Sequence, residues 1–177
     1  SEEIIDAYDA SNIEGLFYSA DFFFTQSFGN PEDFYLYQTG LILSGGYSVN
    51  NKLSFISSMR VTLLDNFDQF NFLVDNEETS VPRVRTRVRE YVTENPIGLD
   101  TAFAHYQDSV SENLFGQVYG GYLETLFAGV GGELLYRPVD SHFAFGIDLN
   151  YVKQRDPYSK LATIDYEAIT GHASVYY

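Results

Sequence analysis

The sequence predicts an all-β protein: an antiparallel up-and-down meander of about eight to ten strands that forms a transmembrane β-barrel or part of one. Three observations support this: long stretches of alternating apolar and polar residues, a high Tyr and Phe content, and short turn segments between the stretches. Alternate side chains of a strand point to opposite faces. In a soluble sandwich the apolar face points inward, whereas in a barrel it faces lipid and the polar face lines the lumen.

The alternation is clearest at residues 143–151, within the longer stretch 113–155. One face of this strand would carry apolar side chains and the other small or polar ones. The apolar set is Phe143, Phe145, Ile147, Leu149 and Tyr151, and the other set is Ala144, Gly146, Asp148 and Asn150.

The first half of the chain is predicted to contain three strands after an entry segment at 1–14. These are residues 15–26, 34–49 and 52–64, with a turn at 28–33 and a tight hairpin at Asn50-Asn51. The pair Gly45-Gly46 predicts a bulge or a bend in the second strand. Strands of about twelve residues exceed the usual five or six and suit a tilted membrane crossing with extensions.

The second half begins with an acidic connection at 65–82, interpreted as a solvated loop because it lacks the calcium-loop order with Gly at the sixth position. Strands at 99–110 and 113–125 then form a hairpin around Ser111-Glu112, and strands at 129–138 and 142–155 form another around 139–141. Residues 161–177 supply one or two more strands. Residues 1–177 are therefore interpreted as a single domain, which can be a piece of a longer barrel protein.

Composition restricts the function classes. The chain has 15 Tyr, 15 Phe and no Trp, and aromatic girdles at membrane interfaces are one reason for such a content. The formal net charge of −15 argues against nucleic-acid binding, which needs cations to displace counterions. With no Cys, disulfides are excluded, and no apolar run reaches the roughly 18 residues of a transmembrane helix.

Four of the ten basic residues lie within seven positions, at Arg83, Arg85, Arg87 and Arg89. In a strand, all four guanidinium groups would lie on one face, at roughly 6.6 Å intervals. They would either pair with carboxylates of the protein or form a cationic strip that binds an anionic polymer through bidentate contacts. Both interpretations remain open from the sequence.

Other polar residues give weaker indications of a functional site. Lys153 and Arg155 near a strand end predict a charged rim at the membrane–water boundary or, alternatively, a polymer entry site. His105, His142 and His172 have no metal-like spacing, and no serine lies in a nucleophile-elbow pattern. We therefore expect no catalytic residues, no metal and no cofactor.

Segments spread over the chain from residue 81 onward resemble a known family. They are VPRVRTRVREYVTENPIGLD (81–100), GQVYGGYLETLFAGVGGELLYRP (116–138), NYVKQRD (150–156) and TGHASVYY (170–177). They are similar to the YjbH/GfcD-type outer-membrane proteins of Gram-negative exopolysaccharide operons. The resemblance implies a β-barrel outer-membrane lipoprotein, longer than this chain, linked to polysaccharide production or export, with no catalytic motif carried over.

The resulting first hypothesis is a non-catalytic barrel of the bacterial outer membrane that assists production, export or surface anchoring of an anionic exopolysaccharide. Its partners would be the polysaccharide, outer-membrane lipid and other proteins of a polysaccharide secretion system, and no nucleic acid. Arg83, Arg85, Arg87, Arg89, Lys153 and Arg155 are the candidate polysaccharide-binding residues. Two alternatives are a soluble β-sandwich that binds glycans or acts as an assembly scaffold, and an outer-membrane lipid-modifying enzyme.

Overall fold

The computed structural model describes residues 14–28, 35–67, 90–91, 95–159 and 161–177. They form eight antiparallel strands in a single sheet. The strands are β1 (Gly15–Phe28), β2 (Tyr35–Ser48), β3 (Leu53–Asp65), β4 (Ile97–Ser111), β5 (Leu114–Tyr122), β6 (Phe127–Tyr136), β7 (Ala144–Arg155) and β8 (Thr163–Tyr176).

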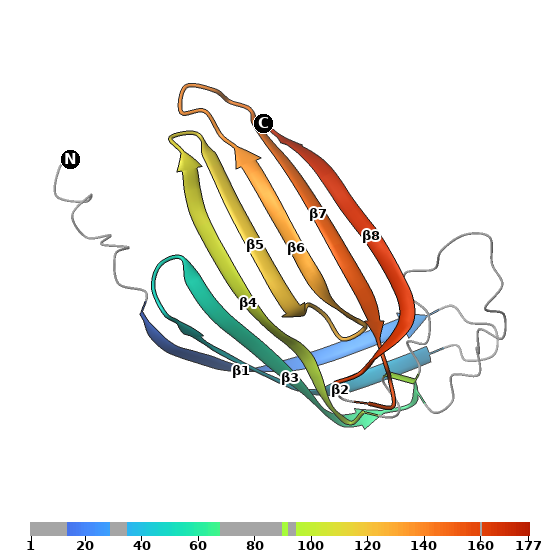
Figure 1. Cartoon of the computed structure of the whole chain (residues 1–177). Coiled ribbons are helices and arrows are strands. Elements are labelled where there is room, and N and C mark those ends of the chain that lie inside the picture. Colours follow the sequence, from blue (N-terminus) through green and yellow to red (C-terminus); the bar gives the residue numbers. More distant parts are fainter. Residues whose placement is uncertain (1–13, 29–34, 68–89, 92–94, 160) are drawn as a thin grey trace.

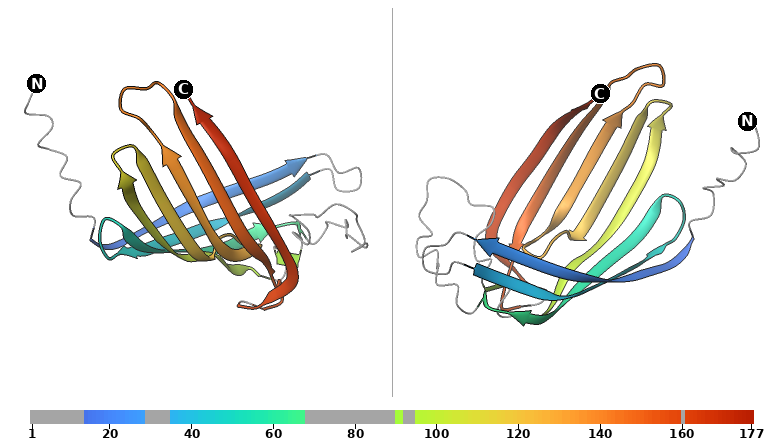
Figure 2. Two further views of the ribbon diagram at one scale, coloured as in Figure 1. Left: turned by 45° about the horizontal axis from the view of Figure 1, so that its top comes forward. Right: turned by 180° about the vertical axis from the view of Figure 1, so that it is seen from behind.

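Each strand pairs with its neighbours in sequence, in the order β1-β2-β3-β4-β5-β6-β7-β8, which confirms the predicted all-β meander. The sheet is not closed, because β1 pairs only with β2 and β8 only with β7 among the described strands. Figure 1 shows one strongly curved layer, in which β1 and β2 run at a steep angle to β5–β8. The two further views in Figure 2 show the same single layer from other sides.

The end of the sheet that holds the turns at 49–52, 112–113 and 137–143 is called the hairpin end. The opposite end, where β3, β5 and β7 end, is called the connection end. At the hairpin end, the Asn50 side chain accepts hydrogen bonds from the backbone N–H groups of Lys52 and Leu53, both at 2.8 Å. This side-chain contact stabilises the tight turn that the Asn50-Asn51 pair predicts.

The strand positions agree with the predicted ranges to within a few residues, and residues 161–177 provide one strand, β8. β5 is shorter than predicted, because it ends at Tyr122 before the turn at 123–126. The acidic connection at 65–82 lies mostly outside the described residues. In the described part of the chain, no helix has the length and apolar character needed to cross a membrane.

A bulge at Gly45-Gly46 is wrong, since the pairing register runs through both residues without a shift, whereas the alternative of a bend stays a prediction. The β2–β3 register shift falls between Thr39 and Gly40. Gly46 is needed for space, because an added Cβ would lie 2.4 Å from the Phe17 ring and 2.3 Å from the Phe55 carbonyl oxygen. An aromatic ring of one strand thus lies over a glycine of the next, an arrangement that also pins the register.

The sheet has one apolar and one polar face, as the alternation predicts. In β7, Phe145, Ile147, Leu149 and Tyr151 are exposed, whereas the alternate residues from Ala144 to Asn150 are half-buried. The exposed apolar side chains recur on every strand of this face. Among them are Leu16, Tyr18, Phe22, Leu43, Phe55, Tyr106, Val118, Val130, Leu149 and Ile169.

The polar face lies on the concave side of the curved sheet. Curvature brings side chains of the concave face together and spreads those of the convex face, and the polar-face residues of β7 and β8 are the less exposed set. Large buried apolar side chains are few among the described residues: Leu36, Tyr91, Phe127 and Val152. Most of the apolar surface is therefore outside, on the convex face.

We predict that Gly131→Ala destabilises the sheet by roughly 1–3 kcal/mol, because the new methyl group overpacks a filled position. Its Cβ would lie 2.1 Å from Asn150 Oδ1 and 2.5 Å from the Tyr119 ring. Gly146→Ala on the neighbouring strand is the matched control, since its Cβ meets nothing closer than 3.5 Å. Urea unfolding midpoints of the two variants would measure the difference, and equal midpoints would contradict the packing argument.

Candidate functional site

The predicted arginine strip, Arg83, Arg85, Arg87 and Arg89, lies outside the described residues, so its geometry stays a prediction. The described functional groups are instead concentrated on the concave polar face and at the connection end. They form three features: a row of polar residues across the sheet, a pocket at the hairpin end, and a cluster around Arg155.

A row of polar side chains crosses five neighbouring strands in register. Its members, called the polar row here, are Gln107, Gln117, Glu133, Asp148 and His172, one each from β4 to β8. Because directly paired residues of antiparallel strands share a face, all five project from the concave face. Antiparallel pairing thereby builds a polar belt from residues that are far apart in sequence.

Hydrogen bonds connect the middle of the polar row. Gln117 Nε2 donates to Glu133 Oε2 at 2.5 Å, and Gln117 Oε1 lies 2.7 Å from His105 Nε2. Since the Gln117 amide nitrogen is used by the carboxylate, its oxygen accepts the second bond and the proton resides on His105 Nε2. The chain His105–Gln117–Glu133 therefore fixes the orientation of all three side chains.

A second network lies beside the first on β5 to β8. The Tyr119 hydroxyl reaches over Gly131 to donate to Asn150 Oδ1 at 2.8 Å. Asn150 Nδ2 in turn donates to Asp148 at 3.1 Å, and His172 Nδ1 lies 3.2 Å from the same carboxylate. Polar atoms on the concave face are thus held by one another, which offsets the cost of removing them from water.

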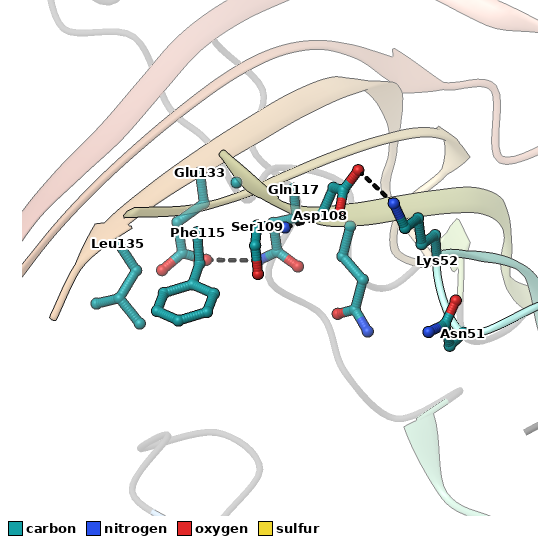
Figure 3. A pocket seen from close by; sticks show the side chains of 10 residues that line it. Asn51, Lys52, Asp108, Ser109, Phe115, Gln117, Glu133 and Leu135 are labelled. Atoms are coloured by element: carbon teal, nitrogen blue, oxygen red, sulfur yellow. Dashed lines mark hydrogen bonds and ion pairs between the residues drawn. The ribbon is translucent and has the colours of Figure 1, made fainter. Parts of the chain in front are cut away.

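The hairpin end of the concave face holds a pocket of about 430 Å³. Figure 3 shows Phe115, Ser109, Gln117, Glu133 and Leu135 on the same side of the sheet, with Asn51 and Lys52 at the margin. Gln107, Asp108 and Gly116 complete the lining. The pocket therefore combines one aromatic ring with several hydrogen-bonding groups and two carboxylates, Glu133 and Asp108.

The Lys52 ammonium at the pocket margin is already paired. Lys52 Nζ lies 2.7 Å from Asp108 Oδ2, and this hydrogen bond together with the charge of Asp108 raises the pKa of Lys52. Tyr106 also donates its hydroxyl hydrogen to Asp108, at 3.1 Å. The positive charge nearest the pocket is thus neutralised by a carboxylate on the adjoining strand.

Arg155 occupies a structural position at the connection end. It is 6% exposed, and its Nη1 donates to the carbonyl oxygens of Leu99 at 2.7 Å and Glu124 at 3.0 Å. Its guanidinium lies over the Tyr122 ring, with 4.8 Å between the guanidinium carbon and the ring centroid. Arg155 thereby ties β7 to the start of β4 and to the turn after β5.

Two bonds fasten the end of the long connection to the same region. The Tyr91 hydroxyl, in a buried side chain, donates to the Arg155 carbonyl oxygen, and Asn95 Nδ2 donates to the Pro157 carbonyl oxygen at 2.8 Å. Beside them Asp100, the extra residue at a register shift in β4, pairs with Arg60 at 3.1 Å. A bulge re-aims the side chain it carries, which here turns Asp100 toward Arg60.

The structure does not place Lys153 with Arg155. Lys153 is exposed on the convex face, where its Nζ lies 3.6 Å from Glu167 Oε2, and the Tyr151 hydroxyl donates to the same oxygen at 2.5 Å. A register irregularity between the two basic residues accompanies this separation. A role in polysaccharide binding stays a prediction for both residues.

In the described ranges, no group of three or more His, Asp or Glu side chains is arranged to hold a metal ion. His105 and His172 each belong to the polar networks above. His142 lies near the C-terminal Tyr177 ring, with 6.4 Å between ring centroids.

Sequence reasoning missed Gln107, Phe115, Gln117 and Glu133 as neighbours. The alternation indicates which face each belongs to, but their juxtaposition depends on the exact register across two turns. The turn at 112–113 does not carry that signal, because it pairs Ser111 with Leu114, and only the register shift between Ser109 and Ser111 brings Gln107 opposite Gln117.

Comparison with known proteins identifies the family. The YjbH family model, described as exopolysaccharide biosynthesis protein YbjH, matches residues 6–177. The chain belongs to this family. It is also 44% identical over 155 residues to an uncharacterized lipoprotein, YjbH, of Escherichia coli (strain K12).

That match covers 86% of this chain and 22% of the relative, so the chain spans about a fifth of the relative's length. No solved structure matches the chain. The YjbH family resemblance expected from the sequence is therefore confirmed and extends over the first half of the chain as well.

We predict that Arg155→Met lowers the free energy of unfolding by about 2–3 kcal/mol, because the carbonyl oxygens of Leu99 and Glu124 lose a charged donor in a buried site. Lys153→Met is the matched control: the side chain is exposed and its ion pair is long. Chemical unfolding of both variants tests the contrast. An Arg155 variant as stable as the parent would contradict this structural role and would favour the charged rim that the sequence predicts for Arg155.

Proposed function

We propose that the chain is part of an outer-membrane β-barrel that assists production, export or surface anchoring of an exopolysaccharide without catalysing a reaction. The family supports the link to exopolysaccharide biosynthesis, and the lipoprotein relative supports a place in the cell envelope. The barrel and the outer membrane are supported by the physical properties of the sheet.

The observation that carries the proposal is the exposed convex face. Val130 in the middle of β6 is 58% exposed and Ile169 on β8 is 77% exposed, and similar residues extend across all the strands between β1 and β8. A soluble monomer rarely exposes an apolar patch larger than a few hundred Å². A lipid environment makes the same surface favourable, and a polar lumen explains the opposite face.

The margins of the convex face also suit a bilayer. Tyr106, Asp108 and Lys52 form one tyrosine–carboxylate–lysine group toward the hairpin end. Tyr151, Glu167 and Lys153 form a second such group toward the connection end. Tyr and Lys at both edges of an apolar band are typical of membrane interfaces, where each presents an apolar body and a polar tip.

The soluble sandwich is the second candidate. A sandwich buries the apolar face of one sheet against another sheet about 10 Å away. The described residues form a single layer, and nothing among them covers the convex face. The barrel therefore accounts for the observed exposure better than the sandwich does.

Within this proposal the concave face is the surface that meets the polymer. Its polar networks are preformed, so they present hydrogen-bonding groups without rearrangement. The arginines at 83–89, placed by sequence before the connection-end anchor at Tyr91, would attract acidic sugar units. Acting as a conduit for the polysaccharide and acting as its docking surface are both passive roles, and neither needs a nucleophilic side chain.

Val130→Arg distinguishes lipid from water around the convex face. In lipid, a mid-strand arginine should destabilise the folded protein by about 2–4 kcal/mol. In water, an arginine at an exposed site should change the stability by less than about 0.5 kcal/mol. Val139→Arg is the matched control, because Val139 lies in a turn at the hairpin end and is 85% exposed.

The readouts are cell fractionation of the full-length protein, SDS-gel mobility with and without boiling, and the yield of folded protein. Outer-membrane location, heat-modifiable migration and a selective defect in the Val130 variant support the barrel. A protein recovered in the soluble fraction, with both variants fully folded, would contradict it.

Replacing Arg85, Arg87 and Arg89 with Gln should reduce surface polysaccharide by weakening attraction to acidic sugars, without lowering the amount of folded protein in the outer membrane. Polysaccharide released from washed cells and heat-modifiable protein would be measured together. Replacing Arg137 with Gln controls for loss of positive charge in general, because Arg137 is exposed and lies outside the lining of the hairpin-end pocket. Unchanged polysaccharide in the arginine variant would remove the strip from the mechanism.

A further inference from the structure

We propose that the hairpin-end pocket is a binding subsite for an uncharged or amino-bearing sugar unit of the polysaccharide, and that it disfavours uronic acids. The proposal rests on the proposed function, because it takes the concave face as the surface that meets the polymer. Its volume of about 430 Å³ lies within the range of about 300–1,000 Å³ that small-ligand pockets occupy.

The apolar part of the pocket is a platform made by β5 and β6. Phe115 and Leu135 face each other directly in the register, and the Phe115 side chain remains 39% exposed. Figure 3 shows both side chains on the concave side, next to Ser109. A flat aromatic ring with an exposed face suits the C–H-bearing face of a pyranose, which is the apolar side of an otherwise hydroxylated molecule.

The polar part of the pocket has unused hydrogen-bonding capacity. Glu133 uses Oε2 for Gln117, and its Oε1 has no side-chain partner among the described residues. Gln107 is exposed, and its amide group has no hydrogen-bond partner among the described residues. Gln107 and Glu133 lie on either side of Gln117, so an amide and a carboxylate oxygen can donate to and accept from different hydroxyl groups of a bound sugar.

The Gln117 bridge makes this polar group rigid. His105 holds Gln117 from one side at 2.7 Å, and Gln117 holds Glu133 from the other at 2.5 Å. A preformed carboxylate position lowers the ordering cost of binding. The polar row therefore orients Glu133 toward the pocket that also contains the Phe115 ring.

The charge of the pocket decides which sugars fit. Glu133 is negative and points into the pocket, whereas the Lys52 ammonium is paired with Asp108 at 2.7 Å. A protonated amine on a sugar would form a charge-assisted hydrogen bond with Glu133. A uronate carboxylate would meet a like charge in a partly desolvated site, which is unfavourable.

This subsite addresses a different sugar unit from the arginines at 83–89, which would attract carboxylates. The two sites together would suit a polymer with acidic and non-acidic units.

The test is isothermal titration calorimetry of the full-length protein in detergent with three trisaccharides: chitosan triose, cellotriose and tri-galacturonic acid. The expected order of affinity is amino sugar, then neutral sugar, then uronic acid. Phe115→Ala should weaken the amino and neutral ligands by about tenfold, as expected for loss of an aromatic anchor. Glu133→Gln should bring the amino and neutral affinities to within about twofold of each other, because the charged acceptor is gone.

Two matched controls should leave the affinities unchanged. Phe145→Ala removes another exposed phenylalanine, this one from the convex face, and Glu112→Gln removes a carboxylate at the turn of the same end, outside the pocket lining. Heat-modifiable migration of each variant verifies folding.

Binding in the expected order, lost selectively in the two pocket variants, supports the subsite. Absence of binding, tri-galacturonate binding as tight as the amino sugar, or equal effects of Phe115→Ala and Phe145→Ala would overturn it. These outcomes are separate from the proposed function. Membrane location and export can stand while the subsite fails, and a soluble protein with the expected sugar preference would retain the subsite and lose the barrel.

Discussion

The described structure depends on one geometric constraint: a single antiparallel sheet presents two faces, and here no second layer covers the apolar one. Each described strand pairs only with its sequence neighbours, so none of the described elements crosses over either face. The period-two alternation assigns the apolar side chains to the convex face and the polar ones to the concave face. In the proposed barrel, lipid would meet the convex face and water would meet the concave face.

The concave face can remain polar because its groups satisfy one another. Glutamine and asparagine side chains bridge carboxylates, a tyrosine and histidines across several strands. These bridges need close approach, and glycine provides it: Tyr119 reaches Asn150 only because Gly131 lies between them without a side chain. Gly131 thus contributes to the polar network by leaving space for the Tyr119 side chain.

Much of the fold could be predicted from the sequence, because alternation and turn residues are local signals. The faces of β7 and the Asn50-Asn51 turn follow from short segments alone. The bulges could not be placed, since a register shift depends on partner strands: Asp100 turns toward Arg60 only because β3 and β4 slip there. The burial of Arg155 could not be predicted either, because its carbonyl partners are 31 and 56 positions away in the sequence.

The open edges connect the fold to the family. β1 and β8 each leave one row of backbone groups unpaired among the described strands, and a hydrocarbon environment does not tolerate unpaired backbone. In the proposed barrel, both edges therefore pair with further strands or with each other. The relative is several times longer than the matched segment, so a protein of that length has residues for additional strands. The same curvature that places the Phe115 pocket inside would then make it part of a lumen, where the spacing of binding groups along the wall determines which sugar units are held.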